Sequence, residues 1–276
     1  MNTNPGDNNN QNGSGGPGER RARIRVIPIL LIQGGGLVKS IKFKNHQYIG
    51  DPINAVKIFN DKEVDEIVVL DISATAEKRP SGRQQIKNLT GEAFMPLAYG
   101  GGITTLDQVK DLINMGVEKI ILNHSAVTNP SLVNEIAGWA GSQSVVVSID
   151  TKKDTWGKYH VYTQNGSKKT GLEPVAFAKQ MENAGAGEIL LQHIGKDGTF
   201  AGYALDIIQM VSRQISIPVV AAGGAGSIAD FKQAIAAGAS AVAAGSMFVL
   251  QRPHRAVLIS YPSPEELQTQ FFSQVD

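Results

Sequence analysis

The chain has 276 residues, of which 42% are hydrophobic and 18% charged, proportions typical of a globular protein with an ample core. Its formal net charge of +1 argues against nucleic acid or an anionic membrane as the main partner. The absence of cysteine excludes disulfides, thiolate zinc sites and cysteine nucleophiles, and fits a cytoplasmic protein. No apolar run approaches the roughly 20 residues needed to span a bilayer.

The N-terminal segment differs in composition from the rest of the chain. Residues 1–21 are rich in Asn, Gly and Pro and have no apolar face, so we expect a disordered tail. It has no hydrophobic run of the kind found in a secretory signal. One domain is expected over residues 22–262, followed by a flexible C-terminal tail at 263–276.

From residue 24 onward, short apolar runs alternate with amphipathic stretches. Strands are predicted at 25–32, 66–72, 95–99, 119–123, 144–150, 188–194, 217–222 and 241–246. Helices are predicted between them, for example at 52–62, 106–115, 130–139, 174–184 and 228–237. Repetition of a strand and then a helix over about 250 residues predicts a (β/α)8 TIM barrel.

Two of the predicted strands run directly into glycines. They are Met95-Pro-Leu-Ala-Tyr-Gly-Gly-Gly-Ile103 and Ile217-Pro-Val-Val-Ala-Ala-Gly-Gly-Ala-Gly226, and a helix start follows each. Glycines let the backbone approach a ligand closely, and a helix start offers unpaired N–H groups to an anion. We therefore expect two phosphate cradles.

The spacing of these features indicates an internal repeat. Pro174 lies 122 positions after Pro52 (174 − 52), and Gly224 lies 123 after Gly101 (224 − 101). Two half-barrels related by a pseudo-twofold axis explain both offsets. A barrel with matching cradles on opposite sides should bind a substrate with a phosphate at each end.

The motifs that follow the predicted strands resemble those of the cyclase subunit of imidazole glycerol phosphate synthase, a HisF-type barrel. They include Leu37-Val-Lys39, Leu70-Asp-Ile72, Gly100-Gly-Gly102, Ser148-Ile-Asp150, Asp197-Gly-Thr199 and Gly223-Gly-Ala-Gly226. Members of that family bind a glutaminase subunit, receive ammonia through the barrel and use it on a bis-phosphorylated ribonucleotide. We expect no cofactor for this chain.

The resemblance implies a set of site residues. One phosphate site would comprise Gly101, Gly102, Asn123 and Ser125, and the other Asp197, Gly198, Gly224 and Ser246. The general base would be Asp150, with Lys39 as a second catalytic candidate unless it is a solvated hairpin lysine. The ring of charges that gates the ammonia passage would comprise Arg25, Glu66, Lys119 and Glu188.

Two departures from the family pattern affect the chemistry. The catalytic aspartate that ends the first strand of the cyclases is replaced by Leu31, which cannot transfer a proton. An aspartate after the sixth strand is replaced by Gly195, with Gln192 and His193 before it. The four charges at the other end match the family pattern, which suggests that ammonia delivery survives while the acceptor chemistry has changed.

The C-terminal run Arg255-Ala-Val-Leu-Ile-Ser-Tyr261 also differs from an ordinary cyclase ending. It resembles a divergent branch associated with sugar amidation in lipopolysaccharide O-antigen synthesis, in which the barrel partners a glutaminase and a separate sugar amidotransferase. Alternatives are a histidine-pathway cyclase, a related half-barrel isomerase acting on a bis-phosphate, and a non-catalytic scaffold that activates the glutaminase.

The remaining sequence motifs say less about function. The five histidines show no H-x-x-H or H-E-x-x-H spacing, so a metal site is not expected. His193 stands out because its strand should point toward the active mouth. The alternating stretch 158–165 before Asn165-Gly166 predicts a hairpin.

Overall fold

The computed structural model describes residues 24–80 and 82–275. The expected disordered tail at residues 1–21 lies outside the described residues. No helix of the described segments is long and apolar enough to cross a membrane.

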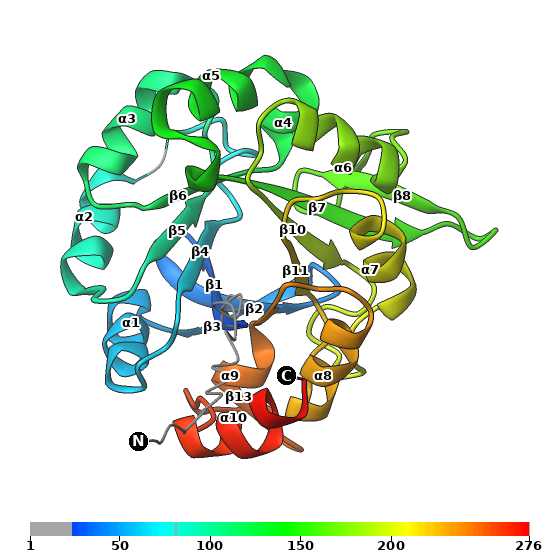
Figure 1. The fold of residues 1–276 in the computed structure, drawn as a ribbon. Coiled ribbons are helices and arrows are strands. Elements are labelled where there is room, and N and C mark those ends of the chain that lie inside the picture. Colours follow the sequence, from blue (N-terminus) through cyan, green and yellow to red (C-terminus); the bar gives the residue numbers. More distant parts are fainter. Residues whose placement is uncertain (1–23, 81, 276) are drawn as a thin grey trace, which may run out of the picture.

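Eight parallel strands close into a barrel with helices around its outside, as Figure 1 shows. Closure is completed where β12 pairs with β1 and where β10 pairs with β7. The barrel strands are β1 (Arg25–Gln33), β4 (Ile67–Asp71), β5 (Leu97–Gly100), β6 (Lys119–Leu122), β7 (Val145–Lys153), β10 (Glu188–His193), β11 (Val219–Ala222) and β12 (Ala241–Ala244). The predicted (β/α)8 barrel is confirmed.

The other elements cover the barrel or extend it. The helices are α1 (Pro52–Asp61), α2 (Arg83–Glu92), α3 (Leu106–Asn114), α4 (His124–Thr128), α5 (Ser131–Ala140), α6 (Pro174–Asn183), α7 (Leu205–Ser212), α8 (Ile228–Ala236), α9 (Ser246–Val249) and α10 (Pro264–Gln270), with the short 3-10 turns η1 (Ser142–Ser144) and η2 (Phe272–Gln274). The shorter strands are β2 (Gly36–Ile41), β3 (Lys44–Gly50), β8 (Tyr159–Thr163), β9 (Lys168–Lys169), β13 (Leu250–Gln251) and β14 (Ala256–Val257).

The helix boundaries follow from local chemistry. Asp51 caps α1 by accepting a hydrogen bond from the Ile53 amide, and Pro52 occupies the first turn, where its missing N–H costs nothing. Gly116 follows α3 with a φ of 98°, and Gly238 follows α8 with a φ of 103°. Only glycine adopts this left-handed backbone without strain, so these glycines end their helices.

The half-barrel repeat is visible in the elements. Helix α6 begins 122 residues after α1 (174 − 52), and β12 begins 122 after β6 (241 − 119). Each half also extends its first strand into an antiparallel hairpin, β2–β3 after β1 and β8–β9 after β7. The β8–β9 turn contains Asn165-Gly166, which confirms the predicted hairpin. Because each hairpin follows the first strand of its half-barrel, both hairpins lie at the C-terminal end of the barrel.

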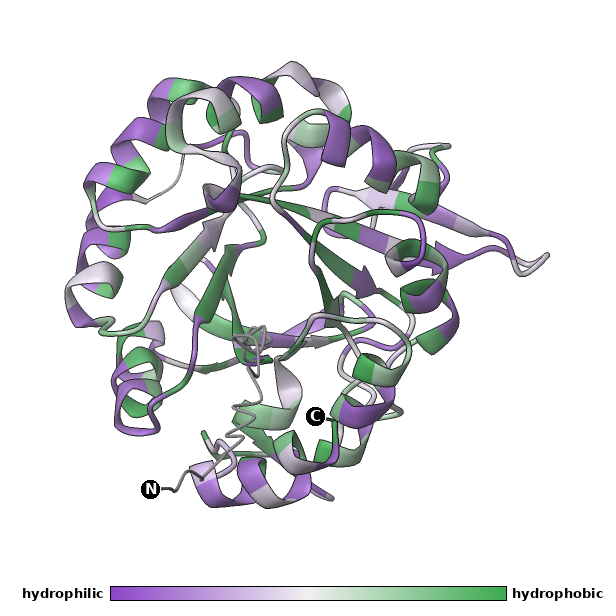
Figure 2. Cartoon of the chain, viewed as in Figure 1, coloured by the Kyte–Doolittle hydropathy of each residue, from purple (hydrophilic) through white to green (hydrophobic). Residues whose placement is uncertain are grey.

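Apolar side chains form two separate clusters, one inside the barrel and one between the barrel and its helices. Figure 2 shows the strands as mostly hydrophobic and the outer helices as mixed, with hydrophilic residues on their outer sides. The inner cluster contains Ala98, Ala222, Ala241 and Ala243, so small side chains line part of the interior. The barrel is therefore an apolar core whose polar groups are confined to its two ends.

The C-terminal segment differs from the flexible tail expected at 263–276. Helix α10 is fixed by a capping box between Ser263 and Glu266. Leu267 and Phe271 are buried in the outer core, and the Phe271 ring meets that of Phe231 at 5.8 Å between centroids. The expectation was wrong because three apolar side chains within six residues, Leu267, Phe271 and Phe272, give this short helix a face that packs on α8.

Candidate functional site

A cavity of about 470 Å³ lies at the C-terminal ends of the barrel strands. Active sites of such barrels occur at this end, because the loops that follow the strands meet there. The cavity is lined by residues from six strand ends and their loops, among them Leu31, Asp71, Arg79, Gly101, Gly102, Asn123, His124, Ser125, Asp150 and Gln192. It therefore unites the predicted base with the first of the two predicted phosphate sites.

Asp150 lies near the end of β7 with only 7% of its surface exposed. Its carboxylate accepts hydrogen bonds from Asn123 Nδ2 at 3.2 Å and from Ser148 Oγ at 3.3 Å. Burial nevertheless raises the pKa of Asp150 to about 7, because an ionised carboxylate is poorly solvated there, and the nearby charge of Asp197 adds to this. A carboxyl group that exchanges its proton near neutral pH is suited to general acid or base chemistry.

Leu31 lies in the wall of the same cavity, near the end of β1 and paired with Leu70 of β4. It is 7% exposed and belongs to the apolar cluster inside the barrel. The first-strand side of the cavity therefore has no carboxylate opposite Asp150.

The first glycine cradle is built by close backbone packing. Gly101 has a φ of 130°, and a Cβ there would lie 2.5 Å from the Asp71 carbonyl oxygen. A Cβ on Gly102 would lie 2.7 Å from the Arg79 carbonyl oxygen. Both positions thus require glycine, and both line the cavity together with Asn123.

The helices after the glycines offer fewer free amides than expected. The Gln108 side chain accepts hydrogen bonds from the amides of Thr104 and Thr105 at the start of α3. At the start of α8, the Asp230 carboxylate accepts from the amides of Gly226 and Ser227. These four amides precede the first helical turn and are already bonded, because each helix carries its own capping side chain three residues in. The two phosphate cradles stay predictions.

The second predicted phosphate site does not line this cavity. A Cβ on Gly198 would lie 2.2 Å from the Ser40 carbonyl oxygen, and one on Gly224 would lie 2.2 Å from that of Gly202. These glycines allow loops to pack against one another beside the cavity. Asp197 and Ser246 lie on the same side, after β10 and β12 respectively.

Lys39 is buried in β2, which rules out the solvated hairpin lysine. Its Nζ donates a hydrogen bond to the Ile29 carbonyl at 2.6 Å and lies next to Gly245. Burial lowers the pKa of Lys39 to about 8, although the charge of Asp197 opposes this shift. Asp197 also accepts hydrogen bonds from Ser40 Oγ at 3.3 Å and Gln192 Nε2 at 3.4 Å, so these groups form one polar network.

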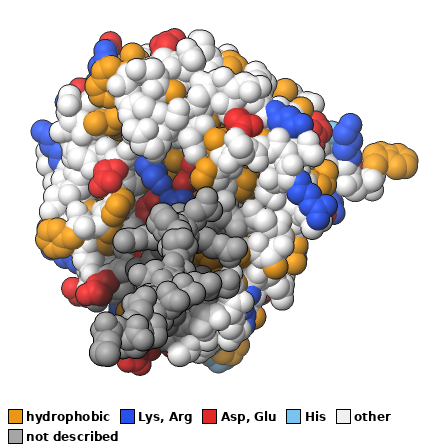
Figure 3. Space-filling view, in the orientation of Figure 1, with side chains coloured by type: hydrophobic (Ala, Val, Ile, Leu, Met, Phe, Trp, Pro, Cys, Tyr) orange, Lys and Arg blue, Asp and Glu red, His pale blue; other side chains and the backbone are white. Residues whose placement is uncertain are grey.

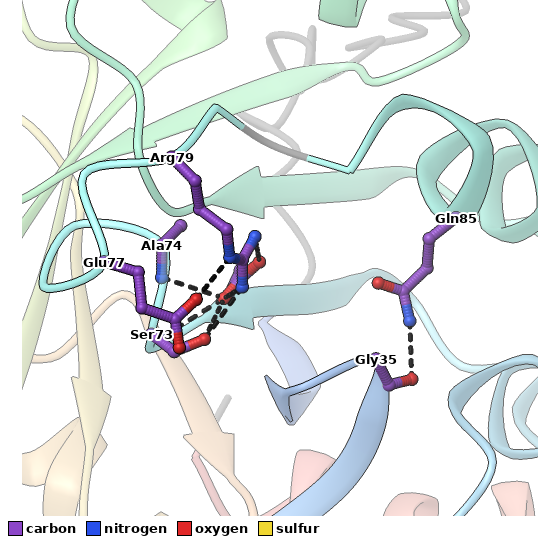
Figure 4. A network of polar contacts seen from close by, with 7 residues as sticks. Gly35, Ser73, Ala74, Glu77, Arg79 and Gln85 are labelled. Carbon is purple, nitrogen blue, oxygen red and sulfur yellow. Dashed lines mark hydrogen bonds and ion pairs between the residues drawn. The ribbon is translucent and has the colours of Figure 1, made fainter.

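The loop between β4 and α2 adds cavity residues that sequence reasoning missed. Arg79 donates to Asp71 at 2.8 Å and 3.0 Å and to Ser73 Oγ at 2.8 Å. Figure 4 shows Arg79 and Glu77 meeting beside Ser73 and Ala74. This network orders the loop over Gly102. The position of Lys78-Arg79 after a barrel strand was the available signal.

His124 is a further cavity residue that the sequence did not single out. Its Nδ1 is buried and has no hydrogen-bond partner among residues 24–80 and 82–275. Burial lowers the pKa of His124, and the charge of Lys168 lowers it further, so the neutral imidazole is favoured. His193, by contrast, does not line the cavity: its Nδ1 accepts from the Lys196 amide at 3.1 Å, and its ring meets Tyr159 edge-on.

Four charged side chains form a closed ring at the opposite, N-terminal end of the barrel. Arg25 pairs with Glu66, and with Glu188 at 2.6 Å. Lys119 pairs with Glu66 at 2.8 Å and with Glu188 at 3.5 Å. The four residues predicted as the ammonia gate are thus brought together, and the apolar inner cluster separates them from the cavity.

The described residues contain no group of three or more His, Cys, Asp or Glu side chains placed to hold a metal ion.

Comparison with known proteins identifies the family. The family model described as "Histidine biosynthesis protein" matches residues 25–252. The chain belongs to this family. Within it, the chain is HisF-like: it is 47% identical over 250 residues to a protein of Leptospira interrogans provisionally named imidazole glycerol phosphate synthase subunit HisF, covering 90% of this chain and 98% of that protein.

Two other relatives extend the comparison. The HisF-like chain is 46% identical over 249 residues to a protein of Pseudomonas aeruginosa provisionally named imidazole glycerol phosphate synthase subunit hisF2, covering 89% and 98% of the two chains. It is 43% identical over 225 residues to the imidazole glycerol phosphate synthase subunit HisF of Alkaliphilus metalliredigens, covering 81% and 89%. The likeness therefore spans the whole barrel.

Proposed function

We propose that this HisF-like barrel receives ammonia from a glutaminase subunit of the HisH type and delivers it to a phosphorylated small molecule in the C-terminal cavity. The observation that carries the proposal is the contrast between the two ends of the barrel. The complete ring of Arg25, Glu66, Lys119 and Glu188 is suited to gating ammonia, whereas Leu31 removes a proton-transfer group from the cavity.

In this proposal the interior of the barrel is the passage. Ammonia is small and neutral, and an apolar interior lined in part by alanines disfavours its protonation, since a charged group is costly to bury. Asp150, with a pKa of about 7, accepts a proton at the acceptor. Gly101, Gly102, Asn123 and Ser125 bind one phosphate of the acceptor in the cavity. Asp197, Gly198, Gly224 and Ser246, beside the cavity, bind the other, and the charge of Lys39 acts on Asp197 there.

The acceptor proposed here is the substrate of a sugar amidation in lipopolysaccharide O-antigen synthesis, with a sugar amidotransferase as a further partner. Leu31 and the C-terminal run from Arg255 support this reading over a histidine-pathway cyclase. The names of the relatives keep the cyclase as the second candidate. A scaffold that only activates the glutaminase would need no cavity with a titrating carboxyl group.

The first experiment tests the partner. Phe94 and Trp139, 88% and 47% exposed, lie just before β5 and at the end of α5, on the N-terminal face. A groove there is lined by Lys119 and Trp139. The full chain should pull down the glutaminase that is encoded in its gene neighbourhood. The double variant Phe94→Asp and Trp139→Asp should fail to do so. Trp156→Asp, on the β7–β8 turn, is the matched control and should bind normally. If the double variant still binds the glutaminase, the N-terminal face of the barrel is not the docking face.

The second experiment tests the chemistry. With the bis-phosphorylated histidine-pathway substrate and ammonium, we expect imidazole-forming turnover below that of an ordinary cyclase by roughly 10²-fold or more, the usual cost of a missing acid or base. Leu31→Asp should recover part of it, and Asp150→Asn should abolish the remainder without affecting glutaminase association. Wild-type turnover within about tenfold of an ordinary cyclase would favour the histidine pathway instead.

A further inference from the structure

A basic patch lies beside the second glycine cradle, on the loop that follows β10 and on the β13–β14 hairpin. We define it by Lys196, Arg252, His254 and Arg255. Arg252 and His254 are exposed, and Lys196 and Arg255 are partly exposed. In residues 195–204 and 250–262 the sole carboxylate is Asp197, which is already engaged by Ser40 and Gln192. The charge of Asp197 also acts on Arg255, but three cationic side chains against one carboxylate leave the patch with a net positive charge.

The two arginines of the patch are held in a fixed arrangement around one aromatic ring. The guanidinium carbon of each lies 5.3 Å from the centroid of Phe200. Arg252 Nη2 donates to the Gly226 carbonyl at 2.9 Å, and Arg255 Nη1 donates to the Gly198 carbonyl at 2.9 Å. Each arginine thus spans from the hairpin to a loop of the second cradle.

These contacts leave the guanidinium groups largely free. A guanidinium carries five N–H donors, and each arginine uses one of them in the described part of the chain. Neither forms an ion pair with a carboxylate among the described residues. Two like charges beside one ring repel each other, and an oxyanion bound between them would offset that repulsion and accept paired N–H bonds.

The backbone at this place is left-handed at two residues of the cluster. Phe200 has a φ of 58° and Arg255 a φ of 54°, a conformation that is unfavourable for residues other than glycine. These two residues are in direct contact.

We propose that Arg252 and Arg255, stacked on Phe200, form a clamp that binds phosphoryl oxygens of the substrate, with two guanidinium groups matched to a diphosphate. The proposal rests on the phosphorylated acceptor proposed above. Beside the second glycine cradle, the anion is thus bound by charged side chains. Backbone amides are less available there, because the Asp230 carboxylate accepts hydrogen bonds from the amides of Gly226 and Ser227. A small diphosphate fits a patch of two arginines better than a polymeric anion, which needs a longer basic stripe.

The test is calorimetric titration of the full chain with inorganic pyrophosphate at low salt. Arg252→Gln and Arg255→Gln should each weaken binding by roughly tenfold, the loss of one charge-assisted pair of hydrogen bonds. Arg255→Lys, which keeps the charge and loses the fork, should weaken it less. Arg213→Gln, an exposed arginine at the end of α7, is the matched control and should bind as wild type.

Asn123→Ala separates this inference from the proposed function, because it alters the first cradle and its contact with Asp150 and leaves both arginines unchanged. Pyrophosphate binding that falls with Asn123→Ala but not with either Gln variant would overturn the clamp and leave the proposed function intact. No binding to the wild type would overturn the clamp outright. Arg255 also holds the hairpin, so thermal melts accompany each titration. If Arg255→Gln is unfolded, the comparison of Arg252→Gln with Arg213→Gln decides the outcome.

Discussion

Asp150 and Leu31 illustrate how single residues set the chemistry of the cavity. They lie near the ends of β7 and β1, which are equivalent strands of the two half-barrels. Burial raises the pKa of Asp150 to about 7, so its proton is exchangeable near neutral pH. Leucine at the equivalent place offers only apolar surface. Of these two positions, only Asp150 can therefore transfer a proton. His124 lines the same cavity as a neutral neighbour.

The raised pKa of Asp150 predicts a dependence of stability on pH. Its folded pKa lies above its unfolded value of 3.8, so folding favours the protonated form. The stability associated with that form is complete below about pH 4 and is lost as pH rises toward 7, at up to about 1.4 kcal/mol per pKa unit. We expect the free energy of unfolding of Asp150→Asn, minus that of the wild type, to be larger at pH 8 than at pH 4.5. Urea unfolding at both pH values measures this difference.

Asp107→Asn, an exposed carboxylate in the first turn of α3, is the control and should change little with pH. An equal difference between wild type and Asp150→Asn at both pH values would show that the carboxyl group is not destabilised by burial.

At the scale of elements, the two hairpins and α10 extend the barrel beyond its eight strands and their helices. The β2–β3 turn and the β8–β9 turn meet at the cavity, where Phe43 and Asn165 both line it. Asn165 Nδ2 lies 3.3 Å from His46 Nε2, so the turns contact each other. The β2–β3 and β8–β9 turns therefore form part of the cavity wall. The turn between β7 and β8, by contrast, projects from the molecule. Figure 3 shows basic and hydrophobic side chains gathered on this projection.

Helix α10 should contribute substantially to stability. Phe271 is fully buried against Phe231 in the outer core. Phe271→Ala should lower the free energy of unfolding by roughly 3–5 kcal/mol, because it removes a buried aromatic side chain and leaves a cavity. Urea denaturation checks this. Phe94→Ala, at an 88% exposed position, should have little effect. A loss below about 1 kcal/mol for Phe271→Ala would mean that the C-terminal segment does not pack on the barrel.

For the whole molecule, the arrangement places a charged ring at one end of the barrel and a titrating cavity at the other. The ring joins residues at the starts of β1, β4, β6 and β10, which come from distant parts of the chain. Glu66 is the most buried of the four, with 4% of its side chain exposed. Both carboxylates bridge the two cations, so removing one leaves charges without a partner.

Glu66→Ala should therefore lower the free energy of unfolding by roughly 3 kcal/mol, as expected when one member of a buried ion pair is removed. Glu92→Ala, which breaks the exposed pair with Lys57, is the matched control and should cost about 0–1 kcal/mol. Chemical denaturation of both variants provides the comparison. Equal, small losses would show that the ring behaves as ordinary surface ion pairs.

The sequence by itself determined the barrel and its repeat. Alternating apolar strands and amphipathic helices, with proline and glycine at their ends, act locally and leave few alternatives. The spacing of 122 residues between Pro52 and Pro174 indicated the half-barrels before any contact was known. The residues Leu31, Asp150 and Gly101 were likewise visible at the ends of their strands.

The tertiary structure decided what depends on neighbours distant in the chain. The buried state of Lys39, the capping of α8 by Asp230 and the packing of α10 were not deducible, because each depends on which side chain reaches which group in three dimensions. The same holds for the pKa of Asp150, which burial sets. Arg252 and Arg255 became meaningful only when the fold brought both beside Phe200, some fifty residues earlier in the chain.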